Sequence, residues 1–125
     1  MVQDYLPAID TDGEIDMVFF DGDFSHAVLK KPALRTGEGA IDRAWERMAW
    51  SGLTTPDPAQ FGVATLAMGF ISDRLGGPPA YGRVDLISGA TGEPLLLEVE
   101  LIDPYLSLDM EPAAAATLAG VLLRA

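Results

Sequence analysis

The sequence of 125 residues predicts an α+β domain in which an antiparallel sheet packs against helices. Three observations lead to that fold class: two segments that each read as a strand pair, a well-delimited helix between them, and a further helix near the end. The content of 49% hydrophobic and 22% charged residues is typical of a folded globular protein. Residues 1–125 suit a single domain with one hydrophobic core.

The first predicted strand pair begins at Glu14. Residues 14–20 have the strand period, and Asp21-Gly22 is a favoured two-residue hairpin turn. A regular ladder from that turn predicts three facing pairs: Phe19 with Phe24, Met17 with His26, and Ile15 with Val28. One face of the hairpin is then apolar, and His26, the only histidine, becomes a packed core residue.

Helical spacing follows the hairpin. A first stripe consists of Ile41, Ala44, Trp45 and Met48. A second helix has Asp57 as its N-cap, Pro58 at its first position and Gln60 in a capping box, and it ends at Gly76. Its predicted buried face comprises Phe61, Ala64, Met68, Ile71 and Leu75. A final helix opens at Pro112 and should turn Leu118, Val121 and Leu122 inward. We expect the helices on one side of the sheet.

The second predicted strand pair, residues 81–88 and 94–102, carries the candidate chemistry. If the apolar residues of both strands face the core, Val84 opposes Val99 and Leu86 opposes Leu97. That register places Asp85 opposite Glu98 and Arg83 opposite Glu100. Facing carboxylates repel each other, and a bound Mg²⁺ would remove the repulsion, because it prefers carboxylate oxygens. An acidic, solvated face explains the same spacing without any metal.

The segments Arg83-Val84-Asp85 and Glu98-Val99-Glu100 resemble the closing signature of the ATP-grasp superfamily, which includes D-alanine–D-alanine ligase and glutathione synthetase. In that signature an R-x-D strand precedes an E-x-N strand. The resemblance implies metal ligands at Asp85, Glu98 and Glu100 and a phosphate contact, with a catalytic role, at Arg83. Glu100 departs from the pattern, since the wider family usually has asparagine there.

The beginning of the chain supports the same resemblance. Residues 2–7 are similar to the hinge strand that contacts adenine in glutathione synthetase-like enzymes, and residues 19–28 resemble the hairpin that follows it. Lys30 and Lys31 come next, where relatives place a basic residue that contacts phosphate or an acidic substrate. An exposed strand end explains the two lysines equally well. Residues 35–39 depart from the glycine-rich loop of the relatives.

The resemblance implies the C-terminal subdomain of an ATP-grasp ligase, with ATP and Mg²⁺ as cofactors and an acylphosphate intermediate. We expect the fragment to begin at the hinge strand, so that nucleotide and a small carboxylate substrate bind with the help of a missing N-terminal half. The isolated chain should then be inactive. The alternative is a non-catalytic binding or self-associating module that retains this half-fold, including a homo-oligomer.

Composition narrows the partners and the location. The formal net charge of −11 opposes binding to nucleic acid or anionic lipid. No apolar stretch approaches the roughly 20 residues that span a bilayer. With no cysteine in the chain, neither disulfides nor thiolate metal sites are available, which fits a cytoplasmic protein.

Overall fold

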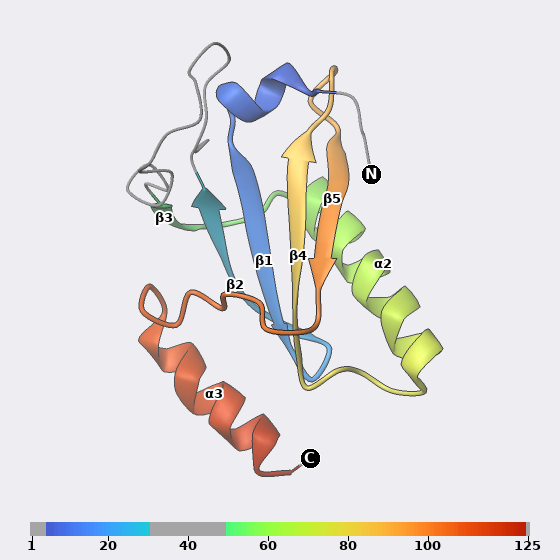
Figure 1. The fold of residues 1–125 in the computed structure, drawn as a ribbon, viewed down its shortest axis with the longest axis vertical. Coiled ribbons are helices and arrows are strands. Elements are labelled where there is room, and N and C mark those ends of the chain that lie inside the picture. The colour runs from blue at the N-terminus through green and yellow to red at the C-terminus, as the bar shows by residue number, and fades with distance from the viewer. Residues whose placement is uncertain (1–4, 31–49, 125) are drawn as a thin grey trace.

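The computed structural model describes residues 5–30 and 50–124, and only the backbone of Trp50 and Ser51. Five strands form one antiparallel sheet in the order β3-β2-β1-β4-β5 (Figure 1). The elements are η1 (Pro7–Asp10), β1 (Glu14–Phe20), β2 (Asp23–Lys30), β3 (Trp50–Thr54), α2 (Pro58–Leu75), β4 (Tyr81–Ser88), β5 (Pro94–Glu100) and α3 (Pro112–Leu122). Both predicted strand pairs are present, and pairing of β1 with β4 joins them.

The β1–β2 hairpin forms at the predicted turn but not in the predicted register. Asp21 and Gly22 have φ values of 53° and 83°, as a type I′ turn requires. Phe19 faces Phe24 as predicted, but a bulge after Val18 shifts the rest of the ladder by one residue. The predicted pairs of Met17 with His26 and of Ile15 with Val28 are therefore wrong. The observed pairs are Val18 with His26, Met17 with Ala27, and Ile15 with Leu29.

The β4–β5 hairpin keeps the register that matters for the candidate site. Three predicted pairs are confirmed: Arg83 with Glu100, Val84 with Val99, and Asp85 with Glu98. Beyond them a bulge pairs Leu86 with Leu96, so the predicted pairing of Leu86 with Leu97 is wrong. The strand also ends at Glu100 instead of extending to Ile102.

Helix α2 starts and ends as its sequence predicts. The Asp57 side chain accepts hydrogen bonds from the backbone of Ala59 and Gln60, and the Gln60 side chain accepts one from the Asp57 backbone. The helix stops at Gly76, whose φ of 77° favours glycine. Ala64 and Met68 are buried as predicted, whereas Phe61 and Leu75 are exposed.

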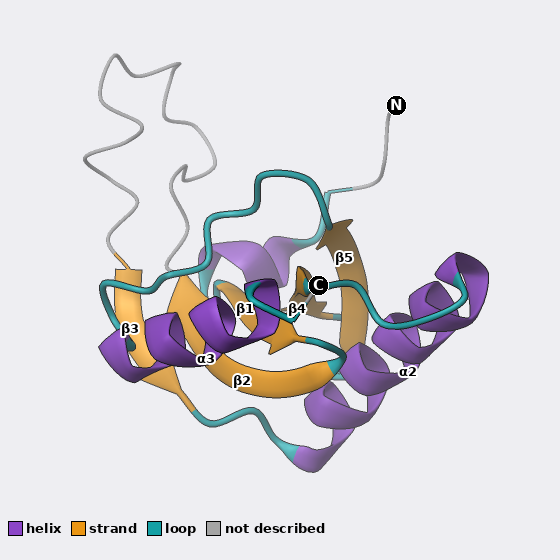
Figure 2. Cartoon of the chain, turned by 90° about the horizontal axis from the view of Figure 1, so that it is seen from below, coloured by secondary structure: helices purple, strands orange, loops and turns teal. Residues whose placement is uncertain are grey.

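The two helices cover opposite faces of the sheet, which corrects the expectation that they share one side (Figure 2). Helix α2 packs with a core cluster that includes Met17, Phe19 and Val84. Val18 and Phe20, which alternate with these residues on β1, point to the other face and pack with α3. Strand alternation explains the two clusters, because successive side chains leave a strand on opposite sides.

Helix α3 covers only part of its face. Val121 is buried and Leu118 is half-buried, but Leu122 is 51% exposed, contrary to prediction. The segment between β5 and α3 crosses the same face and is tied to β2 by His26, whose Nε2 lies 2.9 Å from the Leu106 carbonyl oxygen. Polar side chains occupy the remainder of that face, toward the start of β1.

Some predictions lie at or beyond the edges of the described residues. The predicted helix around Trp45 is outside them, and so is Lys31. In the predicted hinge segment, residues 2–4 are also outside, and residues 5–7 form no strand, since η1 begins at Pro7. Strand β3 was not predicted. Among the helices that the structure describes, none has both the length and the apolar character of a membrane-spanning segment.

Candidate functional site

The candidate site lies on the α3 side of the sheet, beyond the end that α3 covers. Arg83 and Asp85 point there from β4, and Glu98 and Glu100 stand opposite them on β5. Lys30, at the last position of β2, reaches the same face from the other side of β1. Four predicted residues of three strands therefore converge around β1 and β4: Lys30, Arg83, Asp85 and Glu100.

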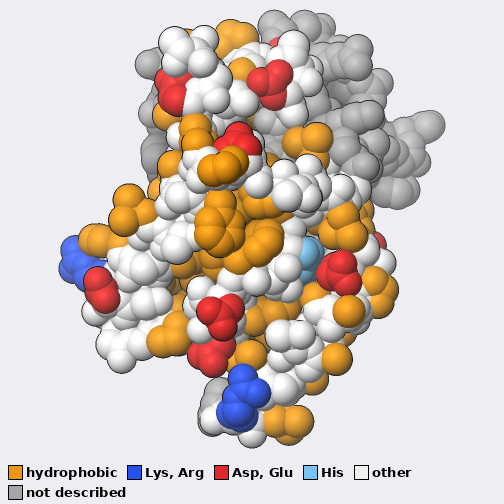
Figure 3. All heavy atoms as spheres, turned by 180° about the vertical axis from the view of Figure 1, so that it is seen from behind, with side chains coloured by type: hydrophobic (Ala, Val, Ile, Leu, Met, Phe, Trp, Pro, Cys, Tyr) orange, Lys and Arg blue, Asp and Glu red, His pale blue; other side chains and the backbone are white. Residues whose placement is uncertain are grey.

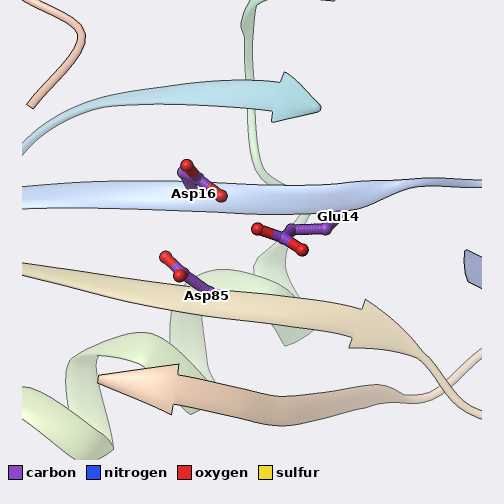
Figure 4. Close-up of side chains that lie close together, drawn as sticks. All are labelled: Glu14, Asp16 and Asp85. Atoms are coloured by element: carbon purple, nitrogen blue, oxygen red, sulfur yellow. The ribbon is translucent and has the colours of Figure 1, made fainter. Parts of the chain in front are cut away.

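Two carboxylates that sequence reasoning missed lie at the centre of this group. Glu14 and Asp16 of β1 each offer an oxygen that lies within 4.8 Å of the other and of an Asp85 oxygen. Figure 4 shows the side chains of Glu14 and Asp16 on β1 and of Asp85 on β4 close together. Asp16 pairs directly with Asp85 in the ladder. The alternation of polar residues at 14 and 16 was visible, but the β1–β4 pairing was not.

Arg83 is the main cation of the group. Its Nε and one terminal nitrogen donate to the two Asp85 oxygens at 2.7 and 2.8 Å, which is a bidentate ion pair. The same terminal nitrogen lies 2.8 Å from Glu100, and the other donates to the Tyr105 carbonyl oxygen at 3.2 Å. Burial alone would lower the pKa of Arg83, but Asp85, Asp16 and Glu100 outweigh it and raise that pKa.

Lys30 is the second cation. It forms an ion pair with Glu14, and its Nζ lies 3.2 Å from an Asp16 oxygen. Burial lowers the pKa of Lys30, but the hydrogen bond to Glu14 and the charges of Asp16 and Asp85 outweigh it, so that the net shift is upward. The lysine is therefore charged at neutral pH, and its side chain is only 19% exposed.

Asp16 is the least satisfied residue of the group. Its side chain is fully buried, and neither of its oxygens accepts a hydrogen bond from the described residues. The nearest cations, Lys30 at 3.2 Å and Arg83 at 3.5 Å, are close enough for charge interactions only. Burial, followed by repulsion from Asp85, raises the pKa of Asp16 from 3.8 to about 7 despite these cations.

The charges of the group do not balance. When all are ionised, the four carboxylates of Glu14, Asp16, Asp85 and Glu100 face two cations, which leaves two negative charges. Magnesium carries the opposite charge and binds carboxylate oxygens. The buried Asp16 oxygens without hydrogen bonds are the kind of donor that such an ion uses. The donor set of this face therefore fits a hard divalent cation.

The predicted ligands do not all lie within that group. One oxygen each of Glu14, Asp16 and Asp85 lies within 4.8 Å of the others. Glu100 instead forms an ion pair with Arg83, and Glu98 is exposed opposite Asp85. The assignment of Glu98 and Glu100 as metal ligands stays a prediction, and so does the phosphate contact of Lys30. Glu14 and Asp16 are additional candidates from the structure.

His26 has a structural role, as its packed position predicted. It is 6% exposed, and Nε2–H donates to the Leu106 carbonyl while Nδ1 lies 2.9 Å from the Ser25 hydroxyl. Burial lowers the pKa of His26, and the Leu106 carbonyl partly opposes the shift. Among the described residues, no carboxylate is hydrogen-bonded to the His26 ring. Ser25 and His26 therefore do not form part of a hydrolase triad.

No family model matches the sequence. The chain is 34% identical over 122 residues to the cycloserine biosynthesis protein DcsG of Streptomyces lavendulae, covering 98% of this chain and 40% of that protein. The crystal structure of D-cycloserine synthetase DcsG superposes with a TM-score of 0.82 and 34% identity, over 94% of this chain and 39% of that one.

A more distant structure has the same fold. D-alanine–D-alanine ligase from Bacillus anthracis, complexed with ATP, gives a TM-score of 0.55 at 17% identity, over 89% of this chain and 36% of the ligase. This chain thus spans about 40% of the length of the relatives it matches.

Proposed function

We propose that this chain is the C-terminal, ATP- and Mg²⁺-binding half of an ATP-dependent carboxylate–amine ligase of the ATP-grasp superfamily, because its sequence and fold are similar to part of D-cycloserine synthetase DcsG. The observation that carries the proposal is the buried pairing of Arg83 with Asp85 inside a group of carboxylates with excess negative charge. Such an arrangement suits a metal–nucleotide complex, in which cation and phosphate are bound together.

The residues of the site have separable roles in this proposal. Asp85, Glu98 and Glu100 would hold Mg²⁺, with Glu14 and Asp16 able to contribute oxygens. When bound, the ion neutralises charge on the transferring phosphoryl group. Arg83 and Lys30 would exchange part of their carboxylate contacts for contacts to the phosphates, since both are fixed as cations at neutral pH. Lys31 would assist from the next position.

The proposed reaction needs no covalent protein nucleophile. The substrate carboxylate attacks the γ-phosphorus of ATP, which gives an acylphosphate and ADP. An amine then attacks the acyl carbon, and phosphate leaves as the amide forms. This chain would supply one wall of the cleft, and the rest of the longer relatives would correspond to the opposing wall. We therefore expect the 125 residues alone to fold without releasing ADP from ATP.

The ligands expected for this chain follow from the same proposal. They are the nucleotide, Mg²⁺ and a small carboxylate, and the net charge of −11 argues against nucleic acid and anionic lipid. A cytoplasmic location would suit ATP as substrate and a chain without cysteine.

Magnesium binding tests the proposal directly. We expect titration with Mg²⁺ to shift backbone amide resonances centred on residues 83–85 and 98–100. Asp85→Asn and Glu98→Gln should each raise the Kd for Mg²⁺ at least tenfold. Glu93→Gln, in the exposed β4–β5 turn, should leave that Kd unchanged. Shifts that are spread evenly over the acidic surface, or that persist in Asp85→Asn, would contradict a metal site here.

The second candidate function is a non-catalytic, self-associating module. One observation favours it, the large apolar residues that α2 exposes, such as Leu66 and Phe70. A magnesium response without any ADP formation in the longer protein would support that candidate over the ligase.

A further inference from the structure

Helix α2 presents an apolar surface on the side away from the sheet. Leu66 is 76% exposed, Phe70 60% and Phe61 42%, although Ala64 and Met68 already bury the helix's other side. Figure 3 views the molecule from the side where α2 lies and shows hydrophobic side chains gathered over the middle of that face. A surface helix normally needs one apolar stripe, and a second exposed stripe is typical of an interaction site.

The surface is grooved along the helix. A hollow of about 600 Å³ follows the outward side of α2 and includes both Gly62 and Gly69. A second hollow of about 600 Å³ lies between α2 and β5 and includes Leu66 and Leu96. The β5 bulge sets the pairing of Leu96 with Leu86 and leaves Leu96 50% exposed beside the helix.

The two glycines are not needed for packing among the residues that the structure describes. There a Cβ atom at Gly62 or Gly69 would meet nothing within 4 Å. Glycine inside a helix is less favourable than alanine, so its presence at two exposed positions needs another reason. Residues seven apart lie on one side of a helix, two turns from each other. Glycines at those positions let a second helix approach closely.

We propose that a second copy of this chain docks on this surface, α2 against α2, antiparallel, about a two-fold axis that passes between Thr65 and Leu66. A two-fold interface must be complementary to itself. In this arrangement Gly62 comes level with Gly69 of the second copy, and Leu66 comes level with the smaller Thr65. Phe61 and Phe70 then flank the close contact on either side. The proposal is independent of the ligase function.

Charge favours this surface over others. Two copies with a net charge of −11 repel each other, so a contact surface must carry few acids. Asp73 is the one charged residue among the described residues that line the two grooves. The antiparallel arrangement brings Asp73 level with Pro58 of the second copy, at the positive end of that helix's dipole. Added salt should therefore strengthen association by screening the overall repulsion.

The size of the surface sets the expected strength. A helix of 18 residues is about 27 Å long, and one face of it offers less than the roughly 800 Å² per partner of a standard interface. The groove beside β5 adds area around Leu96. We therefore expect a reversible dimer with a Kd on the order of 10 μM.

Sedimentation equilibrium of the 125-residue chain tests the dimer. Leu66→Arg should weaken association at least tenfold. Leu123→Arg, at the 89% exposed leucine that follows α3, is the matched control and should leave the Kd unchanged. A chain that stays monomeric at about 1 mM, or that loses association equally in both variants, would overturn the proposal.

Cysteine cross-linking tests the arrangement, since the natural chain has no cysteine. Thr65→Cys lies next to its own copy across the proposed axis and should form a disulfide dimer on mild oxidation. Ala115→Cys, on the exposed side of α3, should remain mostly monomeric under the same conditions. Equal cross-linking of both variants would rule out the two-fold at Thr65.

Gly69→Ala separates association from folding. The substitution should raise the Tm of the dilute monomer, because alanine is the better helix former, and weaken dimerisation at least tenfold, because a methyl group keeps the helices apart. If both the Tm and the Kd improve or stay the same, the glycine does not mark a close contact.

Discussion

Asp16 and Met17 are neighbours on β1 and are both fully buried, but they lie on opposite faces of the sheet and depend on different physics. Met17 packs with α2 in an apolar cluster that excludes water. Asp16 lies among charged groups, with none of its oxygens hydrogen-bonded by the described residues. Val84 and Asp85 on β4 also lie on opposite faces, although both Asp85 oxygens accept hydrogen bonds from Arg83. Burial alone therefore does not identify which residues stabilise this fold, and the two faces should respond differently to substitution.

The apolar face should give the largest loss. Phe19 is 1% exposed and meets Phe24 edge-on, with ring centroids 5.8 Å apart. We expect Phe19→Ala to lower the free energy of unfolding by about 3–5 kcal/mol, from lost burial and the cavity left behind. Urea denaturation measures this. Leu123→Ala, at an exposed position, should change stability by less than about 0.5 kcal/mol. Comparable losses in the two variants would contradict the assigned core.

Removal of a cation from the polar face should cost nearly as much. Arg83→Gln leaves Asp85 and Asp16 without their shared partner, and a buried ion pair that loses one member typically costs about 3 kcal/mol. The loss at pH 7 should shrink at pH 5, because Asp16, with a pKa of about 7, then carries a proton and no longer repels Asp85. Arg124→Gln is the control, since Arg124 is 67% exposed and 3.8 Å from Asp21. An equally small effect of both substitutions would show that Arg83 is dispensable for the fold.

Substitution of Asp16 should raise the free energy of unfolding, whereas the two preceding substitutions lower it. Its pKa is about 7 in the folded chain, against 3.8 for an unperturbed aspartate, so the folded state keeps a proton that the unfolded state loses between those values. Stability conferred by this group is thus highest at low pH, falls as pH rises from about 4 to 7, and stays low above. We expect Asp16→Asn to be about 1–2 kcal/mol more stable than the natural chain at pH 8 and to lose this advantage toward pH 4.

The check is the difference in unfolding free energy between the two proteins across that pH range. Asp73→Asn, at an exposed position, serves as control and should give a flat difference. If Asp16→Asn is the less stable protein at every pH, Lys30 and Arg83 compensate the buried charge fully, and the two faces are more alike than their hydrogen bonds suggest.

The smallest expected effect compares the helices that cover the two faces. Asp57 caps α2 with two hydrogen bonds, whereas Glu111 at the start of α3 makes no side-chain cap. Asp57→Ala should therefore lower the unfolding free energy by about 1 kcal/mol, and Glu111→Ala by less than about 0.5 kcal/mol. Thermal denaturation resolves the difference. A larger effect at Glu111 would mean that α3 depends on contacts of that side chain other than a cap.

Local signals predicted the local elements well. The Asp21-Gly22 turn, the capping box at Asp57 and the ends of β4 were all recognisable, because each depends on a few consecutive residues. The bulges in the β1–β2 and β4–β5 hairpins were not, since a regular ladder is the simplest register and nothing in the sequence marks the extra residue. Phe61 and Leu75 were assigned to the core by periodicity, which cannot tell a core stripe from an exposed apolar one.

The candidate site was half visible for the same reason. Arg83, Asp85 and Glu100 lie within one hairpin, so the register of that hairpin was enough to bring them together. Glu14 and Asp16 join them only through the pairing of β1 with β4, which connects residues far apart in the sequence.

The β1–β4 pairing also has a kinetic consequence. Each hairpin can form from nearby residues, but Phe20 meets Tyr81 only after a long loop has closed, so docking of the hairpins should be the slow step of folding. Glu14, Asp16 and Lys30 give the first hairpin a net negative edge, and the second brings Arg83 with Asp85, Glu98 and Glu100. Two like-charged edges must therefore meet in the transition state. Ionic strength, and divalent cations in particular, should set how fast this chain folds.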